Sequence, residues 1–249
     1  MSEHHGTANG RVALVTGGSG GIGRVAAERL ARDGMDVAVH YAGNRSAAEE
    51  VVGSIAASGG RAMAVGGDVA DEGAMTEVFD ALERRFGGVD VVVNAAGIMI
   101  LGPLADFDLG KLDRMHRVNI RGTFVVDQLA AKRVREGGAI VNFSTSVVKL
   151  GLPAYAAYAA SKGAVEAISL ILARELRGRD VTVNAVAPGP TATPLFFEDK
   201  SEELVDNIAN ANPMERLGTP EDIAEVVSLL AGPGRWVNGQ TLYANGGMG

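Results

Sequence analysis

Cysteine is absent from this 249-residue chain. Without thiols the chain can form no disulfide, no thiolate zinc site and no cysteine nucleophile. Histidine is scarce as well, because two of the four, His4 and His5, stand at the extreme N-terminus. We therefore expect no metal site.

Long apolar runs and excess positive charge are also missing. No uninterrupted apolar run approaches the ~18 residues of a membrane span. Lys and Arg number 23 against 30 Asp and Glu, and the resulting net charge of −7 argues against a nucleic-acid binder. Residues 1–9 lack the basic and apolar regions of a signal peptide and are expected to form a flexible tail. The sequence thus favours a soluble, cytoplasmic protein that binds neither nucleic acid nor membrane.

Short β-branched runs alternate with helical patterns along the whole chain, and no linker divides it. Apolar runs such as 89–94 are typical of strands buried on both faces, as in a parallel sheet covered by helices. We predict strands at 11–16, 36–41, 62–66, 89–95, 139–143, 181–187 and 240–243. Helices are predicted at 21–33, 46–58, 71–86, 112–136, 154–177 and 220–230, with Ser46 and Asp71 as N-caps. Residues 10–249 are therefore expected to form one doubly wound α/β domain of the Rossmann type, with a seven-stranded parallel sheet.

A glycine-rich loop follows the first predicted strand and opens the first helix. Glycines let the backbone approach a pyrophosphate, and the helix N-terminus offers free N–H groups to it. Gly18, Gly20 and Gly23 satisfy G-x-G-x-x-G, a dinucleotide-binding pattern in this strand-to-helix context. The alternative is a connector without a ligand. The predicted cofactor contacts are Gly17, Ser19, Gly21, Ile22 and Gly23.

The end of the second strand bears on the choice of cofactor. An NAD site usually has an acid here for the ribose 2′-hydroxyl, but none occurs between Asp36 and Glu49. Tyr41, Asn44 and Arg45 stand there instead, and an arginine can pair with a 2′-phosphate. NADP(H) is therefore favoured, with NAD(H) possible, because Arg45 could also be a solvated residue at a helix start.

Two further strand ends are suited to a flat cofactor. Asp68, followed by Val69, can accept a hydrogen bond from an adenine amino group. The small residues after Asn94 leave room for the cofactor to lie against the loop Ala95, Ala96 and Gly97. Each could also be an ordinary turn at a strand end.

Tyr158 and Lys162 carry the most specific chemical signal. They lie at i and i+4 in an alanine-rich helix, so their side chains share one face. A phenol with a pKa of ~10 needs a shift of ~3 units to exchange protons near neutrality, and a neighbouring ammonium acts in that direction. Hydroxyl residues at 144–146 end the preceding strand and could hold a substrate oxygen beside Tyr158.

Together these motifs make the chain similar to the short-chain dehydrogenase/reductase superfamily, over essentially all residues after about Gly10. Within this superfamily, the chain most resembles the trihydroxynaphthalene-reductase-like and 3-oxoacyl-carrier-protein-reductase-like members. The loop 188–193 and the segments 218–224 and 235–247 add to the resemblance. It implies an oxidoreductase acting on CH–OH and C=O groups, assembled as a homotetramer, with a dimer possible.

The resemblance also implies a role for each site residue. Tyr158 would exchange the proton, and Lys162 would hold the nicotinamide ribose and lower the pKa of Tyr158. Asn119 would fix a water behind Lys162. The nicotinamide end would be held by Pro188, Gly189, Thr191 and Thr193.

Two departures from the family pattern stand out. The catalytic serine usually lies 13 residues before the tyrosine, where this chain has Thr145. We favour Ser144 as the catalytic hydroxyl, with Thr145 and Ser146 as alternatives. The second departure is Gly20, because NADP-preferring relatives often carry a basic residue there.

A lid over residues 190–213 is expected to close the substrate pocket. It contains Leu195, Phe196 and Phe197, which favour an apolar or aromatic carbonyl substrate, although these residues could simply seat the lid on the core. The opposite wall would comprise Ile98, Met99, Val147, Val148, Pro153 and Tyr155. The alternative functions are an epimerase or dehydratase that retains its cofactor, and a dinucleotide sensor without turnover.

Overall fold

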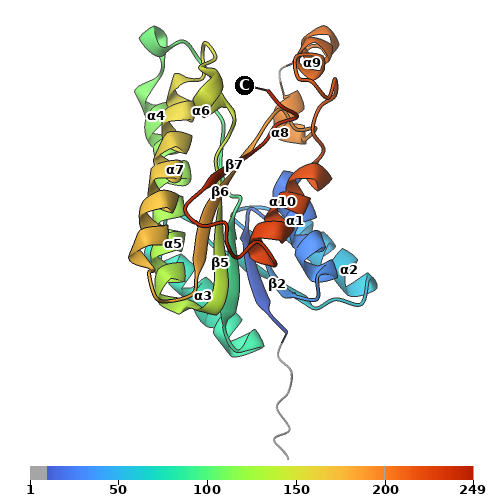
Figure 1. The fold of residues 1–249 in the computed structure, drawn as a ribbon, viewed down its shortest axis with the longest axis vertical. Helices are drawn as coiled ribbons and strands as arrows, with labels where there is room; N and C mark the ends of the chain where they lie inside the picture. The colour runs from blue at the N-terminus through green and yellow to red at the C-terminus, as the bar shows by residue number, and fades with distance from the viewer. Residues whose placement is uncertain (1–9, 199, 249) are drawn as a thin grey trace, which may run out of the picture.

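Seven parallel strands form the centre of the computed structural model, which describes residues 10–198 and 200–248 (Figure 1). The predicted tail, residues 1–9, lies outside the described residues. The strand order is β3-β2-β1-β4-β5-β6-β7, and every neighbouring pair is parallel. The strands are β1 Val12–Thr16, β2 Asp36–Tyr41, β3 Ala62–Gly66, β4 Val89–Asn94, β5 Val134–Phe143, β6 Thr182–Pro188 and β7 Thr241–Ala244. The predicted fold is confirmed.

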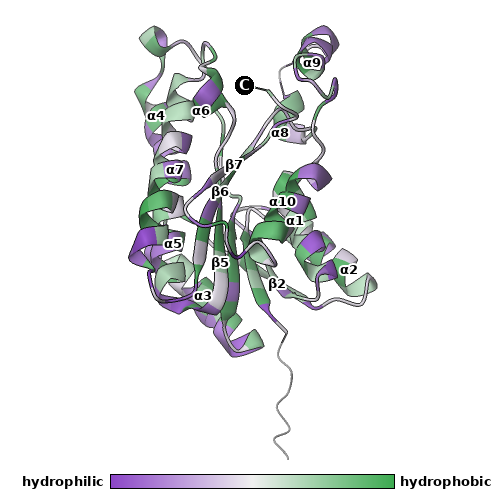
Figure 2. Cartoon of the chain, in the orientation of Figure 1, coloured by the Kyte–Doolittle hydropathy of each residue, from purple (hydrophilic) through white to green (hydrophobic). Residues whose placement is uncertain are grey.

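Helices cover both faces of the sheet, because successive side chains of each strand point to opposite sides. Val12 and Leu14 belong to one apolar core, while Ala13 and Val15 belong to the other. Figure 2 shows the strands as largely hydrophobic, as burial on both faces requires. One face is covered by α1 Gly21–Arg32, α2 Arg45–Ala57 and α10 Pro220–Ala231, and the other by α3 Glu72–Phe86, α5 Gly122–Arg133 and α7 Ala156–Glu175.

The remaining helical segments gather around the C-terminal edge of the sheet. They are η1 Leu104–Asp106, α4 Leu109–His116, the π-helical segment η2 Arg117–Arg121, α6 Val147–Leu150, α8 Pro194–Phe197 and α9 Glu202–Ala209. The chain moves outward from β1 to β3 and then returns to place β4 on the other side of β1. Ligands of such sheets bind beyond the carboxyl ends of the strands at this reversal.

Two local expectations are wrong. The single helix predicted at 112–136 is divided into α4, η2 and α5, and it ends at Arg133, because residues from Val134 already pair with β4 in strand β5. The N-cap of α2 is Asn44 and not Ser46, since the Asn44 side chain accepts a hydrogen bond from Ala47 N. Asp71 caps α3 as predicted.

One helix among the described residues, α7, is long and apolar enough to cross a bilayer by length and composition. Its inner face packs on the sheet, where Val165, Leu172 and Ala173 are buried. It also carries Tyr158 and Lys162 toward the C-terminal edge. In this fold α7 therefore packs on the sheet with its inner face and leaves its outer face exposed.

Candidate functional site

The glycine-rich loop leaves no room for side chains at two positions. A Cβ at Gly23 would stand 2.3 Å from the carbonyl oxygen of Gly17. A Cβ at Gly17 would stand 2.9 Å from the backbone of Ala96, and Gly17 has a positive φ of 64°. The loop backbone is thus held closely between β1 and β4 with α1 starting beside it. This arrangement fits the pyrophosphate of a dinucleotide, because the ligand meets backbone N–H groups and a helix N-terminus.

Gly23→Ala is expected to weaken NADPH binding severely, because the methyl group and the Gly17 carbonyl cannot share the same space. The matched control is Gly20→Ala, since a Cβ at Gly20 meets nothing within 4 Å and its φ of −163° suits any residue. Fluorescence titration with NADPH would measure both variants. A Gly23→Ala variant that bound NADPH as tightly as the Gly20→Ala variant would contradict this packing argument.

At the end of β2, the residues predicted to select the cofactor stand around the start of α2. Asn44 caps the helix, and Arg45 follows it with 74% of its side chain exposed. The Arg45 Nε donates to Glu49 at 2.7 Å, which leaves the two terminal nitrogens of the guanidinium facing solvent. Tyr41 is half-buried at the last position of β2. A free guanidinium fork beside a helix N-terminus is suited to a phosphate group.

Asp68 follows β3 and is already engaged on both carboxylate oxygens. It accepts from Ala70 N at 2.9 Å and from the Arg117 guanidinium at 2.6 Å. Partial burial acts to raise the pKa of Asp68, but these donors outweigh it and leave the pKa below its ordinary value. The buried Val69 lies beside it. Arg117 belongs to η2, so the expected adenine end is tied to the segment that carries Asn119.

Asn94 lies inside the sheet rather than at its surface. Its amide nitrogen donates to Asp127 at 2.8 Å and to Asn142 at 2.9 Å, while its oxygen accepts from Thr16. Thr16 in turn accepts from Ala96 N at 3.2 Å. The Asn94 side chain therefore holds the glycine loop and the 95–97 loop together, and only the backbone that follows it faces the cofactor edge.

Asp127 lies next to the site, bonded to Asn94 and Asn142, and was not predicted from the sequence. Its carboxyl is fully enclosed between α5 and the sheet, and burial raises its pKa to about 7 even though Asn142 and Asn94 donate to it. In the sequence it resembles an ordinary helical aspartate. The only available signal was the occurrence of polar Asn94 and Asn142 within apolar strands.

The π-helical segment η2 widens the backbone at Asn119. This residue is buried, and its amide clamps Ile98 by accepting from Ile98 N and donating to Ile98 O, each at 2.9 Å. It also donates to Ser161 at 3.0 Å. A Cβ at Gly97 would stand 3.3 Å from Asn119 Oδ1 and 3.4 Å from Lys162 Nζ. The two predicted site residues thus converge on Gly97, and π-bulges of this kind are frequent at functional sites.

Lys162 and Tyr158 lie one turn apart on α7 and face the end of β5. Lys162 Nζ donates to Phe143 O at 2.8 Å, and burial lowers the pKa of Lys162 to about 8. Burial raises the pKa of Tyr158 to about 12, because it disfavours the charged phenolate. The lowering of the Tyr158 pKa implied by the family resemblance is therefore not provided by these protein groups alone.

The three hydroxyls at 144–146 point in different directions, as expected at the end of an extended strand. Ser144 Oγ donates to Glu166 Oε1 at 2.5 Å, and Ser146 Oγ donates to Ala187 O at 3.3 Å. Thr145 Oγ1 accepts from Val147 N at 3.4 Å. The choice of Ser144 as the catalytic hydroxyl, with Thr145 and Ser146 as alternatives, stays a prediction.

The loop expected to hold the nicotinamide end follows β6. A Cβ at Gly189 would stand 2.8 Å from Asn245, and Thr191 Oγ1 donates to Gly189 O at 2.9 Å, so the turn after Pro188 is tightly packed. Thr193 caps α8 by accepting from Phe196 N. A Cβ at Gly21 would lie 3.9 Å from Thr193 Cγ2, so this loop closes against the start of α1.

The predicted lid comprises α8 and α9. Figure 1 shows these helices on one flank of the C-terminal edge and α4 with α6 on the other. Phe196 and Phe197 pack edge to face at 5.4 Å between ring centroids. Apolar side chains remain exposed on both flanks: Leu101, Leu104, Leu109 and Leu152 on one, and Leu195, Phe197, Leu204 and Met214 on the other.

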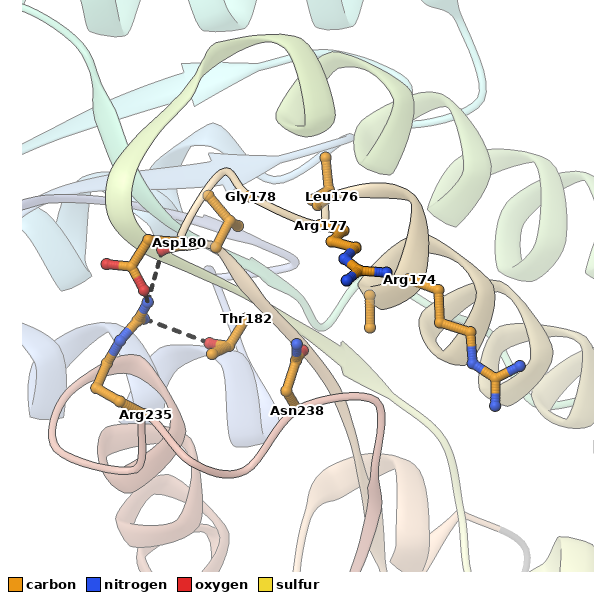
Figure 3. A pocket seen from close by; sticks show the side chains of 10 residues that line it. Arg174, Leu176, Arg177, Gly178, Asp180, Thr182, Arg235 and Asn238 are labelled. Carbon is orange, nitrogen blue, oxygen red and sulfur yellow. Dashed lines mark hydrogen bonds and ion pairs between the residues drawn. The ribbon is translucent and has the colours of Figure 1, made fainter.

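A separate surface pocket of about 540 Å³ lies at the opposite edge of the sheet, beside the start of β6 (Figure 3). Arg235 donates to Asp180 within it, at 2.9 Å between Nη2 and Oδ1. The exposed side chains of Arg174 and Arg177 lie along its rim. None of the predicted site residues lines this pocket, so the candidate site is the C-terminal edge alone.

Comparisons with known proteins identify the family of the chain. The family model described as enoyl-(acyl carrier protein) reductase matches residues 17–249. A short-chain type dehydrogenase/reductase of Picea abies is 45% identical over 250 residues, which cover 96% of this chain and 92% of that protein. Versicolorin reductase 1 of Aspergillus parasiticus is 40% identical, with 99% of each chain covered.

A solved structure leads to the same family. The angucycline C-6 ketoreductase LanV with bound NADP has a TM-score of 0.90 and 37% identity, and the match covers 96% of this chain and 95% of that one. The fold, the glycine loop and the Tyr158–Lys162 pair are thus accompanied by similarity over nearly the whole length. The chain belongs to the short-chain dehydrogenase/reductase superfamily.

Proposed function

We propose that this chain reduces a ketone on an apolar or aromatic ring system, with Tyr158 as the proton donor. As a member of its family it is an NADP-dependent oxidoreductase that interconverts a carbonyl group and an alcohol. The observation that carries the proposal is the cluster of Tyr158, Lys162 and Asn119, with the hydroxyls at 144–146, at the same edge as the glycine loop. A sensor that only binds dinucleotide would not need this set of proton-transfer groups.

Each residue then has a chemical role. Ser144 and Tyr158 would hold the substrate oxygen between their hydroxyls, and Tyr158 would donate its proton to that oxygen. Lys162, which donates to Phe143 O, would hold the ribose of the cofactor, and Asn119 keeps the neighbouring loop at Ile98 in place. Bound NADPH supplies the hydride. In the oxidative direction the Tyr158 phenolate accepts the proton from the alcohol.

The other cofactor contacts follow from position. Gly17, Ser19, Gly21, Ile22 and Gly23 would hold the pyrophosphate, with Asp68 and Val69 at the adenine. Ala95, Ala96 and Gly97 would lie under the nicotinamide riboside. The carboxamide would contact Pro188, Gly189, Thr191 and Thr193.

The substrate class is inferred from the exposed apolar flanks and from two relatives. Those relatives are named versicolorin reductase 1 and angucycline C-6 ketoreductase. Leu152, Leu195 and Phe197 expose apolar side chains on both flanks of the C-terminal edge, which suits a planar apolar ligand.

The test is a comparison of NADPH oxidation rates on fused aromatic ketones, small aliphatic aldehydes and 3-oxoacyl thioesters. We expect kcat/KM to be highest for the fused aromatic ketones. A preference for 3-oxoacyl thioesters would keep the reductase chemistry and replace the substrate class. NADPH binding without turnover of any class would favour the sensor.

Arg45 is proposed to pair with the cofactor 2′-phosphate. Arg45→Glu should therefore raise the KM for NADPH by about tenfold or more, because a charge-assisted contact becomes a repulsion, while the KM for NADH stays nearly unchanged. Arg84→Glu is the matched control, since Arg84 is exposed near the end of α3 at the opposite edge of the sheet. An equal KM change for both cofactors would refute the assignment.

We also propose that the chain assembles with copies of itself, as a homotetramer or a dimer, and works in the cytoplasm. The support for assembly is an exposed apolar face on α5 and α7, where Phe124 and Ile171 have 55% and 54% of their surface exposed. Exposed apolar faces are typical of interaction sites. The only tryptophan, Trp236, is fully exposed as well, in the loop after α10.

If α5 and α7 form the interface, Ile171→Glu should lower the molar mass measured by sedimentation equilibrium by at least half. Ile171 points outward in the single chain, so the fold itself should tolerate the charge. The control is Glu175→Gln, an exposed position one turn later on the same helix. An unchanged mass for Ile171→Glu would place the interface elsewhere, and a monomeric wild type would remove it.

A further inference from the structure

A buried polar cluster crosses the sheet near the carboxyl ends of three neighbouring strands. Thr16 of β1, Asn94 of β4 and Asn142 of β5 occupy adjacent positions of the parallel register. Asp127 of α5 lies against them, and all four side chains are buried. Among the described residues, both donors to the Asp127 carboxylate are neutral amides, Asn94 to Oδ1 and Asn142 to Oδ2, each at 2.8 Å. The proton transfer proposed above does not use this carboxylate.

Asn94, Asp127 and Asn142 form a closed triangle of hydrogen bonds. Asn94 Nδ2 donates to Asp127 and also to Asn142 Oδ1 at 2.9 Å, while Asn142 Nδ2 donates to Asp127. Asn94 uses one atom for both of its contacts, whereas the other two residues use a different atom for each. Three amides in this triangle would always leave two like atoms face to face, whichever way each amide is turned. A carboxylate at position 127 removes the conflict, because both of its oxygens accept.

The triangle fixes the direction of the Asn94 amide, and this direction reaches the cofactor edge. With its nitrogen held by two acceptors, Asn94 turns its oxygen to Thr16 Oγ1, which donates to it at 3.3 Å. The Thr16 oxygen is then free to accept from Ala96 N at 3.2 Å. A turned Asn94 would present an N–H group to Thr16 and compete with Ala96 N for that oxygen. The Ala96 backbone packs against Gly17, so the same bond also bears on the glycine-rich loop.

We infer that Asp127 is a positioning residue for the cofactor cradle, which comprises the glycine-rich loop and the 95–97 loop. Its two acceptor oxygens keep the Asn94 amide directed at Thr16, and Thr16 holds Ala96 N in the position that NADP(H) requires. A mismatched pair of buried polar groups is costly, and turning Asn94 or shifting the 95–97 loop would relieve it. This inference rests on the proposed function, since it assumes that the 95–97 loop lies under the nicotinamide riboside.

Asp127→Asn tests the inference, because it keeps the shape of the side chain and creates the mismatched triangle of three amides. It should raise the dissociation constant for NADPH in fluorescence titration by about tenfold, the effect of one unsatisfied buried group. The matched control is Asp90→Asn, near the start of β4, where the buried Asp90 accepts from Val12 N at 2.6 Å and pairs with Arg135. Asp90→Asn should lower stability in urea unfolding and leave the NADPH affinity unchanged.

Two double variants separate the pattern of donors and acceptors from the loss of charge. Asp127→Asn with Asn142→Asp returns a carboxylate to the triangle at a position where both of its contacts can accept. Ser169, which accepts from Asn142 Nδ2 at 2.9 Å and donates to Val165 O at 2.8 Å, can turn its hydroxyl toward the new carboxylate. NADPH affinity should therefore recover. Asp127→Asn with Asn94→Asp has the same charge and side-chain types but leaves two like atoms face to face, so its affinity should stay low.

Equal NADPH affinity in the wild type and Asp127→Asn would overturn the inference, and so would recovery in both double variants or in neither. If Asp127→Asn alone does not fold, the two double variants decide. Crystal structures without cofactor give a further readout, since the distance from Ala96 N to Thr16 Oγ1 should lengthen in Asp127→Asn and return with Asn142→Asp. If the wild type reduced no carbonyl, the proposed function would fail, while the NADPH titrations would still decide whether Asp127 holds the cofactor cradle.

Discussion

Tyr158→Phe should lower kcat for ketone reduction by about 10²- to 10⁴-fold, the range that a positioned general acid contributes. The substitution removes only the phenolic hydroxyl, so the half-buried ring keeps its place on α7. NADPH affinity should stay close to that of the wild type, because the glycine loop and Arg45 are untouched. Stopped-flow reduction and NADPH fluorescence titration measure the two quantities. Tyr243→Phe, in β7, is the matched control, and equal losses in both variants would contradict the assignment.

The pH dependence of the reaction gives a second test of Tyr158 as the group that exchanges the proton. Burial raises its pKa to about 12 in the protein alone, so the phenol remains protonated and able to donate across the neutral range. Oxidation of the alcohol requires the phenolate, so its rate should increase as pH rises toward that pKa, whereas reduction should not. Bound cationic nicotinamide would move the oxidative rise to lower pH. A rise that persists in Tyr158→Phe would assign it to another group.

Lys162→Met should also abolish most turnover, by about 10²-fold or more, because the ammonium is the only cation that the structure places beside Tyr158 and Gly97 among the described residues. Unlike the tyrosine variant, it should weaken NADPH binding, since Lys162 is proposed to hold the nicotinamide ribose. Measured kcat and the dissociation constant for NADPH should therefore change together. Loss of kcat with unchanged affinity would limit Lys162 to the proton-transfer step.

The same variant should make the cofactor-free protein more stable. Burial lowers the pKa of Lys162 from 10.5 to about 8, so the folded state disfavours its charge. The unfolded chain binds more protons between these pH values, so the free energy of unfolding rises as pH increases from about 8 to 10.5. Below pH 8 the buried charge of Lys162 lowers the free energy of unfolding by about 3 kcal/mol, and the hydrogen bond to Phe143 O partly offsets this loss.

Replacement of Lys162 by methionine removes the buried charge and fills a similar volume. Lys162→Met should therefore raise the free energy of unfolding at pH 7 by roughly 1–3 kcal/mol. Urea unfolding without NADPH measures the change, and the gain should disappear near pH 10.5. A lower stability than the wild type at pH 7 would mean that Lys162 is held by more than the Phe143 carbonyl.

The sheet could be predicted from the sequence because its strands are buried on both faces and are therefore runs of apolar residues. The start of β5 could not be predicted, because it is not such a run. Residues 134–138 include an arginine, a glutamate and two glycines, and they join the sheet only through pairing with β4. The division of the long helix by η2 was equally hidden, because a π-helical turn leaves no periodic trace in sequence.

In the site too, features set by local spacing could be predicted, and features set by tertiary packing could not. The i, i+4 spacing placed Tyr158 and Lys162 on one face correctly, because helix geometry is local. Spacing could not decide among the hydroxyls at 144–146, since their directions depend on how β5 ends against α7. Asp127 and Glu166 were missed because each looks like a solvated helical acid until its partners from the sheet are in place.

The most direct test of this account follows the hydride itself. NADPH labelled with deuterium at the transferring carbon of the nicotinamide would be incubated with the enzyme and a fused aromatic ketone, and the product analysed by mass spectrometry. We predict an alcohol that carries the deuterium on its carbinol carbon in the wild type and almost no product in Tyr158→Phe. An alcohol without deuterium, or NADPH that stays bound and unreacted with every ketone, would contradict it.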